Sequence, residues 1–163
     1  MQISPDRDIR EKLGPYLVPI GRTAAGLVLG IVLSFIGIVV AWGLFIFFGF
    51  QSLDLFLGSL FIGAGLGAGV GGFSAWLHLD RENSLILGLT AALLVGAGIL
   101  GAWGGYEYGS TVKVECCAMP TKSPTYYTAF GATMAANAAG LVVGAVRAYL
   151  SKKGQAQIHN AMH

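Results

Sequence analysis

Residues 55–79 read LFLGSLFIGAGLGAGVGGFSAWLHL, a stretch that contains no charged side chain and is dense in glycine at its centre. A helix needs about 20 apolar residues to cross a hydrocarbon core of about 30 Å, and this stretch is long enough. Glycine destabilises a helix in water by roughly 1 kcal/mol relative to alanine. In lipid, the same residue allows two helix backbones to approach closely. The stretch therefore predicts a transmembrane helix with tightly packed neighbours.

Three further uncharged runs, at 23–53, 83–106 and 123–146, accompany this one. Of the 163 residues, 55% are hydrophobic and only 11% are charged, and the mean hydropathy is +0.68. Soluble domains carry about 25% charged residues, so this composition excludes a soluble enzyme, a disordered tail and a nucleic-acid-binding domain. Membrane-spanning barrels use short strands that alternate apolar and polar residues, which these runs do not.

We therefore predict an all-α integral membrane protein, a four-transmembrane-helix bundle with tight glycine-mediated packing. Residues 1–163 would form a single four-helix membrane domain. The helices are predicted at approximately 20–48, 53–78, 84–106 and 125–150, with an outer loop at 107–124.

The N-terminal segment has the features of a short interfacial helix. Ser4 can cap it, and Pro5 suits its first position. The pair Gly14–Pro15 is expected to end it. The alternative for residues 5–13 is a frayed polar tail.

Basic residues gather on one side of the predicted membrane. Four spans place both termini on the same side, and most Lys and Arg residues then lie there, with only Lys113 and Lys122 opposite. Because cytoplasmic loops are enriched in Lys and Arg, we expect a multi-pass protein of a bacterial-type plasma (inner) membrane. Both termini would be cytoplasmic and the loop 107–124 external.

Small residues recur four apart in all four predicted helices. The second helix has two nearly opposite glycine faces, so it is expected to lie at the centre of the bundle. A chain of four helices has few internal interfaces for so many small-residue stripes, and we expect some of them to meet other subunits. The predicted helix-packing residues are Gly63, Gly65, Gly67, Gly69, Gly71, Gly72, Gly88, Gly96, Gly131, Gly140 and Gly144.

The glycine run 63–72 looks similar to the repeats of rotary ATPase proteolipids. That resemblance is confined to this decapeptide. Such proteolipids need an ion-carrying carboxylate at mid-membrane, and the predicted helices carry no Asp or Glu there. The comparison therefore does not imply an ion-carrying role.

Asn137 is the most polar residue deep in a predicted helix, and Thr133 precedes it by one turn. Such polar intramembrane groups hydrogen-bond between helices, which is the leading interpretation; a pore or ligand contact is the alternative. The hydroxyls of other intramembrane residues can bond back to their own helices, and this group comprises Ser34, Ser59, Ser74 and Thr90.

The histidines and cysteines offer weak candidate sites. His78 is expected at an interface, with an axial contact to a pigment as the alternative. His159 and His163 are four apart near the chain end, which makes a poor metal site, so no metal is predicted. Cys116 and Cys117 lie in the external loop, where a disulfide with each other or with a partner chain is possible. Metal or redox chemistry is the alternative there.

No catalytic set can be assembled, because the histidines and the cysteines are predicted on opposite sides of the membrane. We expect a non-catalytic polytopic subunit that is a structural or assembly component of a larger membrane complex, an energy-transducing one included. Its partners would be membrane lipids and other membrane protein subunits, without nucleic acid. No cofactor is predicted, although a lipid, pigment or quinone contact stays open. The alternative is a small homo-oligomeric channel or transporter; an enzyme acting on lipid or quinone is a third class.

Overall fold

The computed structural model describes residues 5–49, 52–76, 83–112 and 124–161. Four helices account for nearly all of them: α1 (Pro5–Phe47), α2 (Leu53–Trp76), α3 (Ser84–Thr111) and α4 (Pro124–Ala161). Each contains a segment long and apolar enough to cross a membrane. The prediction of an all-helical chain with four helices of membrane-spanning length is confirmed. The four segments are Val18–Phe47, Leu53–Ala75, Ser84–Thr111 and Pro124–Leu150.

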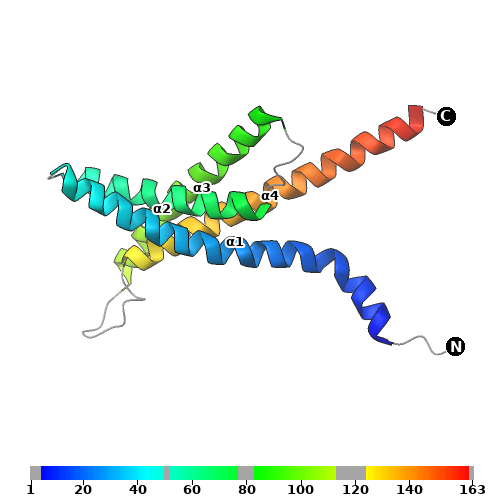
Figure 1. Ribbon diagram of the computed structural model, residues 1–163, viewed down its shortest axis with the longest axis horizontal. Coiled ribbons are helices and arrows are strands. Elements are labelled where there is room, and N and C mark those ends of the chain that lie inside the picture. Colours follow the sequence, from blue (N-terminus) through cyan, green and yellow to red (C-terminus); the bar gives the residue numbers. More distant parts are fainter. Residues whose placement is uncertain (1–4, 50–51, 77–82, 113–123, 162–163) are drawn as a thin grey trace.

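The N-terminal part of α1 differs from the prediction. α1 begins at Pro5 and continues through Gly14 and Pro15, where the sequence predicted an end. Figure 1 shows that the dark blue first part of α1 bends away from the rest. Proline lacks a backbone donor and crowds the preceding turn, so within a longer helix it produces a kink, and α1 contains both Pro15 and Pro19 in this part.

Two helices are longer than predicted at their C-terminal ends. α3 continues to Thr111, and the hydroxyls of Ser110 and Thr111 each donate to a carbonyl three residues earlier, at 2.7 Å. The segment that the sequence assigned to a loop from 107 onward therefore begins as helix. α4 continues to Ala161 instead of ending near 150, because the polar residues that follow the apolar span include no proline.

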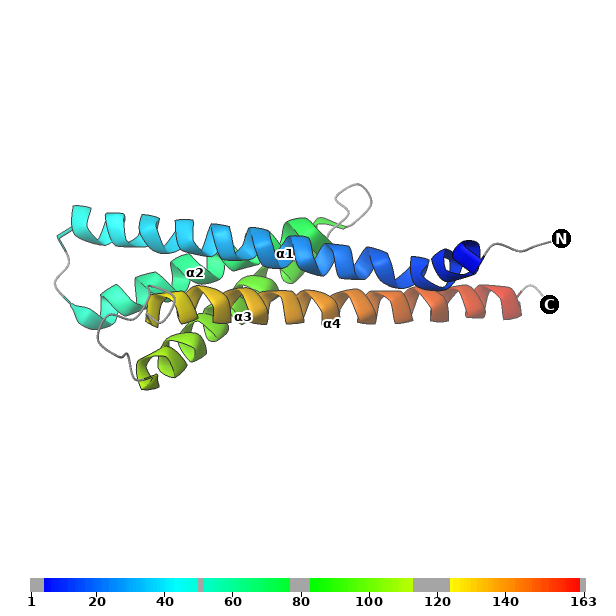
Figure 2. The ribbon, with the colours of Figure 1, turned by 90° about the horizontal axis from the view of Figure 1, so that it is seen from below.

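Successive helices run in alternating directions, and both chain ends lie at the same end of the bundle (Figures 1 and 2). α1 packs against α2, and α3 packs against α4. α2 also contacts α3 and α4, and α4 contacts α1. α2 and α4 each contact the other three helices, so both lie at the centre of the bundle.

The core is built from small side chains. Its fully buried hydrophobic positions are mainly alanines, such as Ala64, Ala68, Ala132 and Ala136. Leucine, valine and phenylalanine side chains instead lie exposed around the outside of the bundle. A soluble bundle would reverse this arrangement, whereas lipid accepts large apolar groups on the outside and the interior gains from close backbone approach.

Candidate functional site

The α1–α2 interface is a contact between two backbones. An added Cβ at Gly63 would overlap the carbonyl group of Gly37, and one at Gly67 would overlap the carbonyl group of Leu33. Gly71 lies over the α1 backbone in the same way. Because these neighbours are backbone atoms, they cannot move aside as the end of a side chain can. One glycine face of α2 therefore lies directly against α1.

The other glycine face of α2 lies against α3. A Cβ at Gly65 would overlap Ile99 and lie 2.7 Å from its backbone nitrogen, and one at Gly69 would lie 2.5 Å from Cγ2 of Val95. The contact is reciprocal, since a Cβ at Gly98 would lie 2.9 Å from the carbonyl oxygen of Gly65. α2 is thus enclosed on two sides by backbone or near-backbone contacts.

The α3–α4 interface uses the same chemistry. Gly101 and Gly131 face each other so closely that a Cβ at either would overlap the carbonyl oxygen of the other. One turn along α3, a Cβ at Gly105 would overlap the carbonyl oxygen of Tyr127. A Cβ added at Gly72 of α2 would lie 3.7 Å from the carbonyl oxygen of Ala136 on α4, an ordinary van der Waals distance. α4 therefore packs against α3 through backbone contacts and against α2 at Gly72.

Not every predicted packing glycine has a neighbour. An added Cβ at Gly88 or Gly96 would meet no atom of the described chain within 4 Å, and the same holds at Gly104. Ala92, which lies between the first two on the same face of α3, is exposed. We call Gly88, Ala92 and Gly96 the α3 outer stripe. Of the two remaining predicted positions, Gly140 is buried and Gly144 is half-buried.

A buried polar cluster, formed by Ser34, Thr133 and Asn137, lies where α1, α2 and α4 meet. The Ser34 hydroxyl donates to the carbonyl of Ala64 on α2 at 3.0 Å and lies 3.3 Å from Oγ1 of Thr133. The prediction that Ser34 bonds back to its own helix is therefore wrong. Thr133 donates to the carbonyl of Ala129 within α4 at 2.9 Å. The Ser34 hydroxyl thus joins α1 to α2 by a hydrogen bond and lies against Thr133 of α4, and neither side chain is ionisable.

Asn137 completes this cluster and leaves one atom without a hydrogen bond. Its Nδ2 donates to the carbonyl of Thr133 at 2.9 Å, while its Oδ1 is buried and has no hydrogen-bond partner among the described residues. The residue is 2% exposed. A Cβ added at Gly26 of α1 would overlap this Oδ1, so the amide oxygen lies against the Gly26 backbone. A Cα–H group at such a helix contact is a weak donor, which compensates only part of the lost hydrogen bond.

A second polar contact joins α3 to α4 nearer the chain ends. Nη2 of Arg147 donates to Oγ1 of Thr90 at 2.9 Å, and Thr90 is 8% exposed. The Thr90 hydroxyl donates in turn to the carbonyl of Ile86 at 2.8 Å, which confirms the predicted bond to its own helix. The interhelical partner was missed, because Arg147 lies 57 residues away and the sequence indicated it only as a cytoplasmic charge.

The Arg147–Thr90 contact predicts a measurable stability difference. Thr90→Val removes the acceptor on α3 and should lower the free energy of unfolding by about 0.6–1.7 kcal/mol, as expected for an interhelical hydrogen bond in a membrane protein. Thr128→Val is the matched control, because Thr128 is buried and its hydroxyl donates to a carbonyl four residues earlier. Thermal unfolding in lipid nanodiscs measures both. Equal losses in the two variants would show that the interhelical bond contributes nothing.

Serine hydroxyls elsewhere follow the local prediction. Ser59 donates to the carbonyl of Phe56 at 2.7 Å, and Ser74 donates to that of Gly71 at 2.9 Å. Several predicted sites lie outside the described residues, namely Cys116, Cys117, His78 and His163. His159 lies within the helical backbone of α4. The disulfide prediction and the interpretations of the histidines stay predictions.

The chain matches no protein-family model, and comparisons with curated proteins and with solved structures find no significant match. The basis for a proposed function is therefore the chemistry of the helices and the polar contacts themselves.

Proposed function

We propose that the chain is a non-catalytic, multi-pass subunit of a larger assembly in a bacterial-type inner membrane, with both termini cytoplasmic and the loop after α3 external. The observation that carries this proposal is the α3 outer stripe. A Cβ added at Gly88 or Gly96 would meet no atom of the described chain within 4 Å, whereas one added at any α2 glycine between 63 and 72 would. The described residues therefore leave a small-residue face of the α3 span uncovered.

An uncovered glycine face has a physical cost in lipid. Helix association in a bilayer depends on van der Waals packing, because lipid chains are as apolar as the side chains they replace. A lipid-facing leucine is favourable for membrane insertion, and the outer surface of α3 has such residues at Leu89, Leu93 and Leu100. Glycine at neighbouring outward positions contributes little to insertion but allows another helix to pack closely. This contrast supports a protein partner for the α3 outer stripe.

The interior of the bundle favours a structural role over a role in transport. We propose that the glycine contacts of α2 with α1 and α3 act as a glycine zipper that holds the bundle in one arrangement. Among the described side chains, the carboxylates on the spans are Asp54 in the first turn of α2 and Glu107 near the end of α3. The cluster of Ser34, Thr133 and Asn137 has no group that titrates near neutral pH. These features favour a scaffold over a proton-coupled transporter.

A leucine in the α3 outer stripe should release the partner. Gly96→Leu should reduce the fraction of chain in the assembly about tenfold, because overpacking of a close helix contact costs about 1–3 kcal/mol. The matched control is Gly43→Leu on α1, since a Cβ at Gly43 also meets no atom of the described chain within 4 Å. The measurement is size-exclusion chromatography with light scattering after mild detergent extraction, with mass spectrometry of the co-purifying chains.

Two results would contradict this proposal. One is a wild-type chain that is a stable lone monomer in nanodiscs of native lipid. The other is a Gly96→Leu variant that co-migrates with the same partners as the Gly43→Leu control. Circular dichroism of both variants would show that each remains helical.

The second candidate, a small homo-oligomeric channel or transporter, is favoured by one observation: the Oδ1 of Asn137, deep in the bundle, accepts no hydrogen bond from the residues that the structure describes. Such an atom could serve a passing polar solute. Gly26 and Gly30 of α1, however, pack directly against the side chains of Asn137 and Thr133. Solute flux in proteoliposomes that is lost in Asn137→Leu would replace the scaffold proposal with this one.

A further inference from the structure

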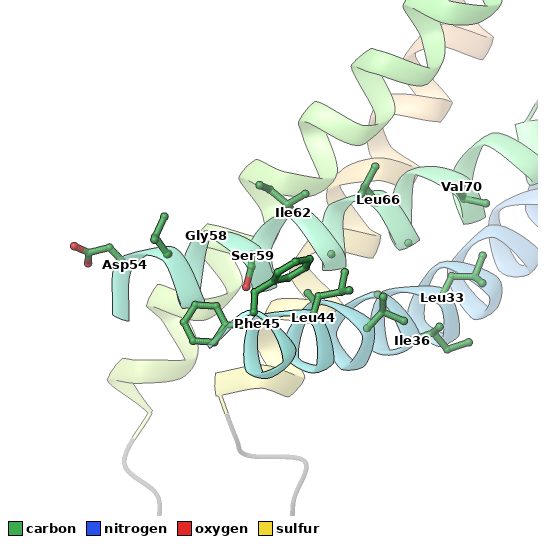
Figure 3. A pocket seen from close by; sticks show the side chains of 17 residues that line it. Leu33, Ile36, Leu44, Phe45, Asp54, Gly58, Ser59, Ile62, Leu66 and Val70 are labelled. Carbon is green, nitrogen blue, oxygen red and sulfur yellow. The ribbon is translucent and has the colours of Figure 1, made fainter. Parts of the chain in front are cut away.

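A groove runs along the α1–α2 pair on the outside of the bundle (Figure 3). Its volume is about 710 Å³. Apolar side chains form its walls, with Ile36 and Leu44 from α1 and Ile62 and Leu66 from α2. All four are exposed, so the groove opens to the surroundings of the bundle and not to its core.

One end of the groove is charged. Asp54, in the first turn of α2, is the only ionisable residue among the described residues that line it. Figure 3 shows Asp54 at one end, beyond Gly58, and Val70 toward the other. The aromatic side chains of Phe45 and Phe48 line the same groove from α1. The hydroxyl of Ser59 donates to its own helix and can still accept a hydrogen bond, but Asp54 is the described lining residue with a negative charge for a cationic ligand.

The dimensions of the groove match an amphiphile that lies along the membrane normal. The α2 segment from Asp54 to Val70 rises about 24 Å at 1.5 Å per residue. The hydrocarbon core is about 30 Å thick, and the α2 span begins at Leu53. In a helix that crosses the membrane from this residue, Asp54 would lie at the interface and the rest of the groove in the hydrocarbon. A ligand that fits this groove has one ionic end and a long apolar remainder.

We propose that this groove binds one membrane lipid with a primary ammonium head group, of the phosphatidylethanolamine class. The ammonium group lies against the Asp54 carboxylate, and an acyl chain lies between α1 and α2. The inference rests on α1 and α2 crossing the membrane, as in the proposed function, but not on the presence of a protein partner.

Charge and hydrogen bonding select this head group. An ammonium ion carries a positive charge and donates hydrogen bonds to a carboxylate. The negative charge of Asp54 repels an anionic phosphatidylglycerol, and a trimethylated choline head group has no N–H to donate. A partner helix would cover Asp54 with apolar surface unless it brought its own cation. An aminolipid supplies the cation and the apolar chain together.

The head-group preference can be measured on the full-length protein. We expect native mass spectrometry of the delipidated, detergent-solubilised chain to show about threefold stronger retention of phosphatidylethanolamine than of phosphatidylglycerol with the same acyl chains, the size expected for an exposed ion pair. Asp54→Asn should abolish this preference. Glu107→Gln is the matched control, because Glu107 is an exposed carboxylate on α3 that does not line the groove, and it should keep the preference.

The position of the acyl chain needs a second variant. Ile62→Trp fills the groove and should reduce retention of both lipids severalfold, whereas Leu89→Trp, at an exposed position of α3, should not. Equal retention of the two lipids by the wild type would overturn the head-group inference, and Asp54→Asn tests it without disturbing the packing. Unchanged lipid retention in Ile62→Trp would contradict the placement of the acyl chain in the groove. Loss of a dimer in Ile62→Trp, with lipid retention intact, would assign the groove to a second copy of the chain.

The two proposals fail in distinguishable ways. A chain without protein partners could still prefer the aminolipid, and a chain in a large assembly could bind both lipids equally. Lipid retention and assembly size therefore report separately on the groove and on the α3 outer stripe.

Discussion

Gly67→Ala should lower the free energy of unfolding by about 1–3 kcal/mol, the cost of overpacking in a well-packed interior. The added Cβ would overlap the Leu33 carbonyl group and lie 2.6 Å from the backbone nitrogen of Ser34. Both neighbours are backbone atoms of α1, so the clash is relieved only if the two helices separate. Separation would also stretch the Ser34 hydroxyl bond to the carbonyl of Ala64, which is 3.0 Å long.

The control for this prediction lies on the same helix. A Cβ at Gly58 meets no atom of the described chain within 4 Å, so Gly58→Ala changes helix propensity without a clash. It should leave stability unchanged or raise it by up to about 1 kcal/mol. Thermal or denaturant unfolding in nanodiscs measures both variants. If Gly67→Ala were as stable as Gly58→Ala, α2 would not be held against α1 as described.

Gly26→Ala should destabilise the chain by about 1–3 kcal/mol, and Asn137→Ala should remove most of that cost. A Cβ at Gly26 would overlap Oδ1 of Asn137, whose side chain is held in place by its 2.9 Å bond to the carbonyl of Thr133. Asn137→Ala deletes the obstructing oxygen, an acceptor that has no hydrogen-bond partner in the described part of the chain. The two substitutions should therefore show a coupling energy of about 1–2 kcal/mol, within the range found for residues in contact.

A second cycle provides the control for this coupling. Gly21 is also on α1, and a Cβ there meets no atom of the described chain within 4 Å. Gly21→Ala and Asn137→Ala should be additive. Additive effects of Gly26→Ala and Asn137→Ala as well would mean that the amide oxygen of Asn137 does not lie against α1.

The polar contacts differ in how far the sequence predicts them. Bonds from Ser59 and Ser74 to their own helices follow from local geometry, because a serine hydroxyl in a helix lies within reach of a carbonyl three or four residues earlier. The same reasoning failed for Ser34, whose hydroxyl bonds to Ala64 on a different helix. The sequence offers both acceptors, and the close approach of α1 to α2 selects between them.

The spans themselves are a property of the sequence alone. Each apolar run has its own transfer free energy into lipid, which depends on composition and length and not on neighbours, so four membrane-length helices follow without tertiary information. The helix ends depend on more local detail, and α3 extends past residue 106 to Thr111.

The assignment of each small-residue face to a neighbour was decided only by tertiary structure. Glycine spacing shows that α2 has two faces suited to close contact. It does not show that Gly63 and Gly67 face α1, that Gly65 and Gly69 face α3, or that Gly88 and Gly96 have no neighbour in the described chain. Glycine has no side chain that could specify a partner, so its role is set by the shapes of the helices that pack around it.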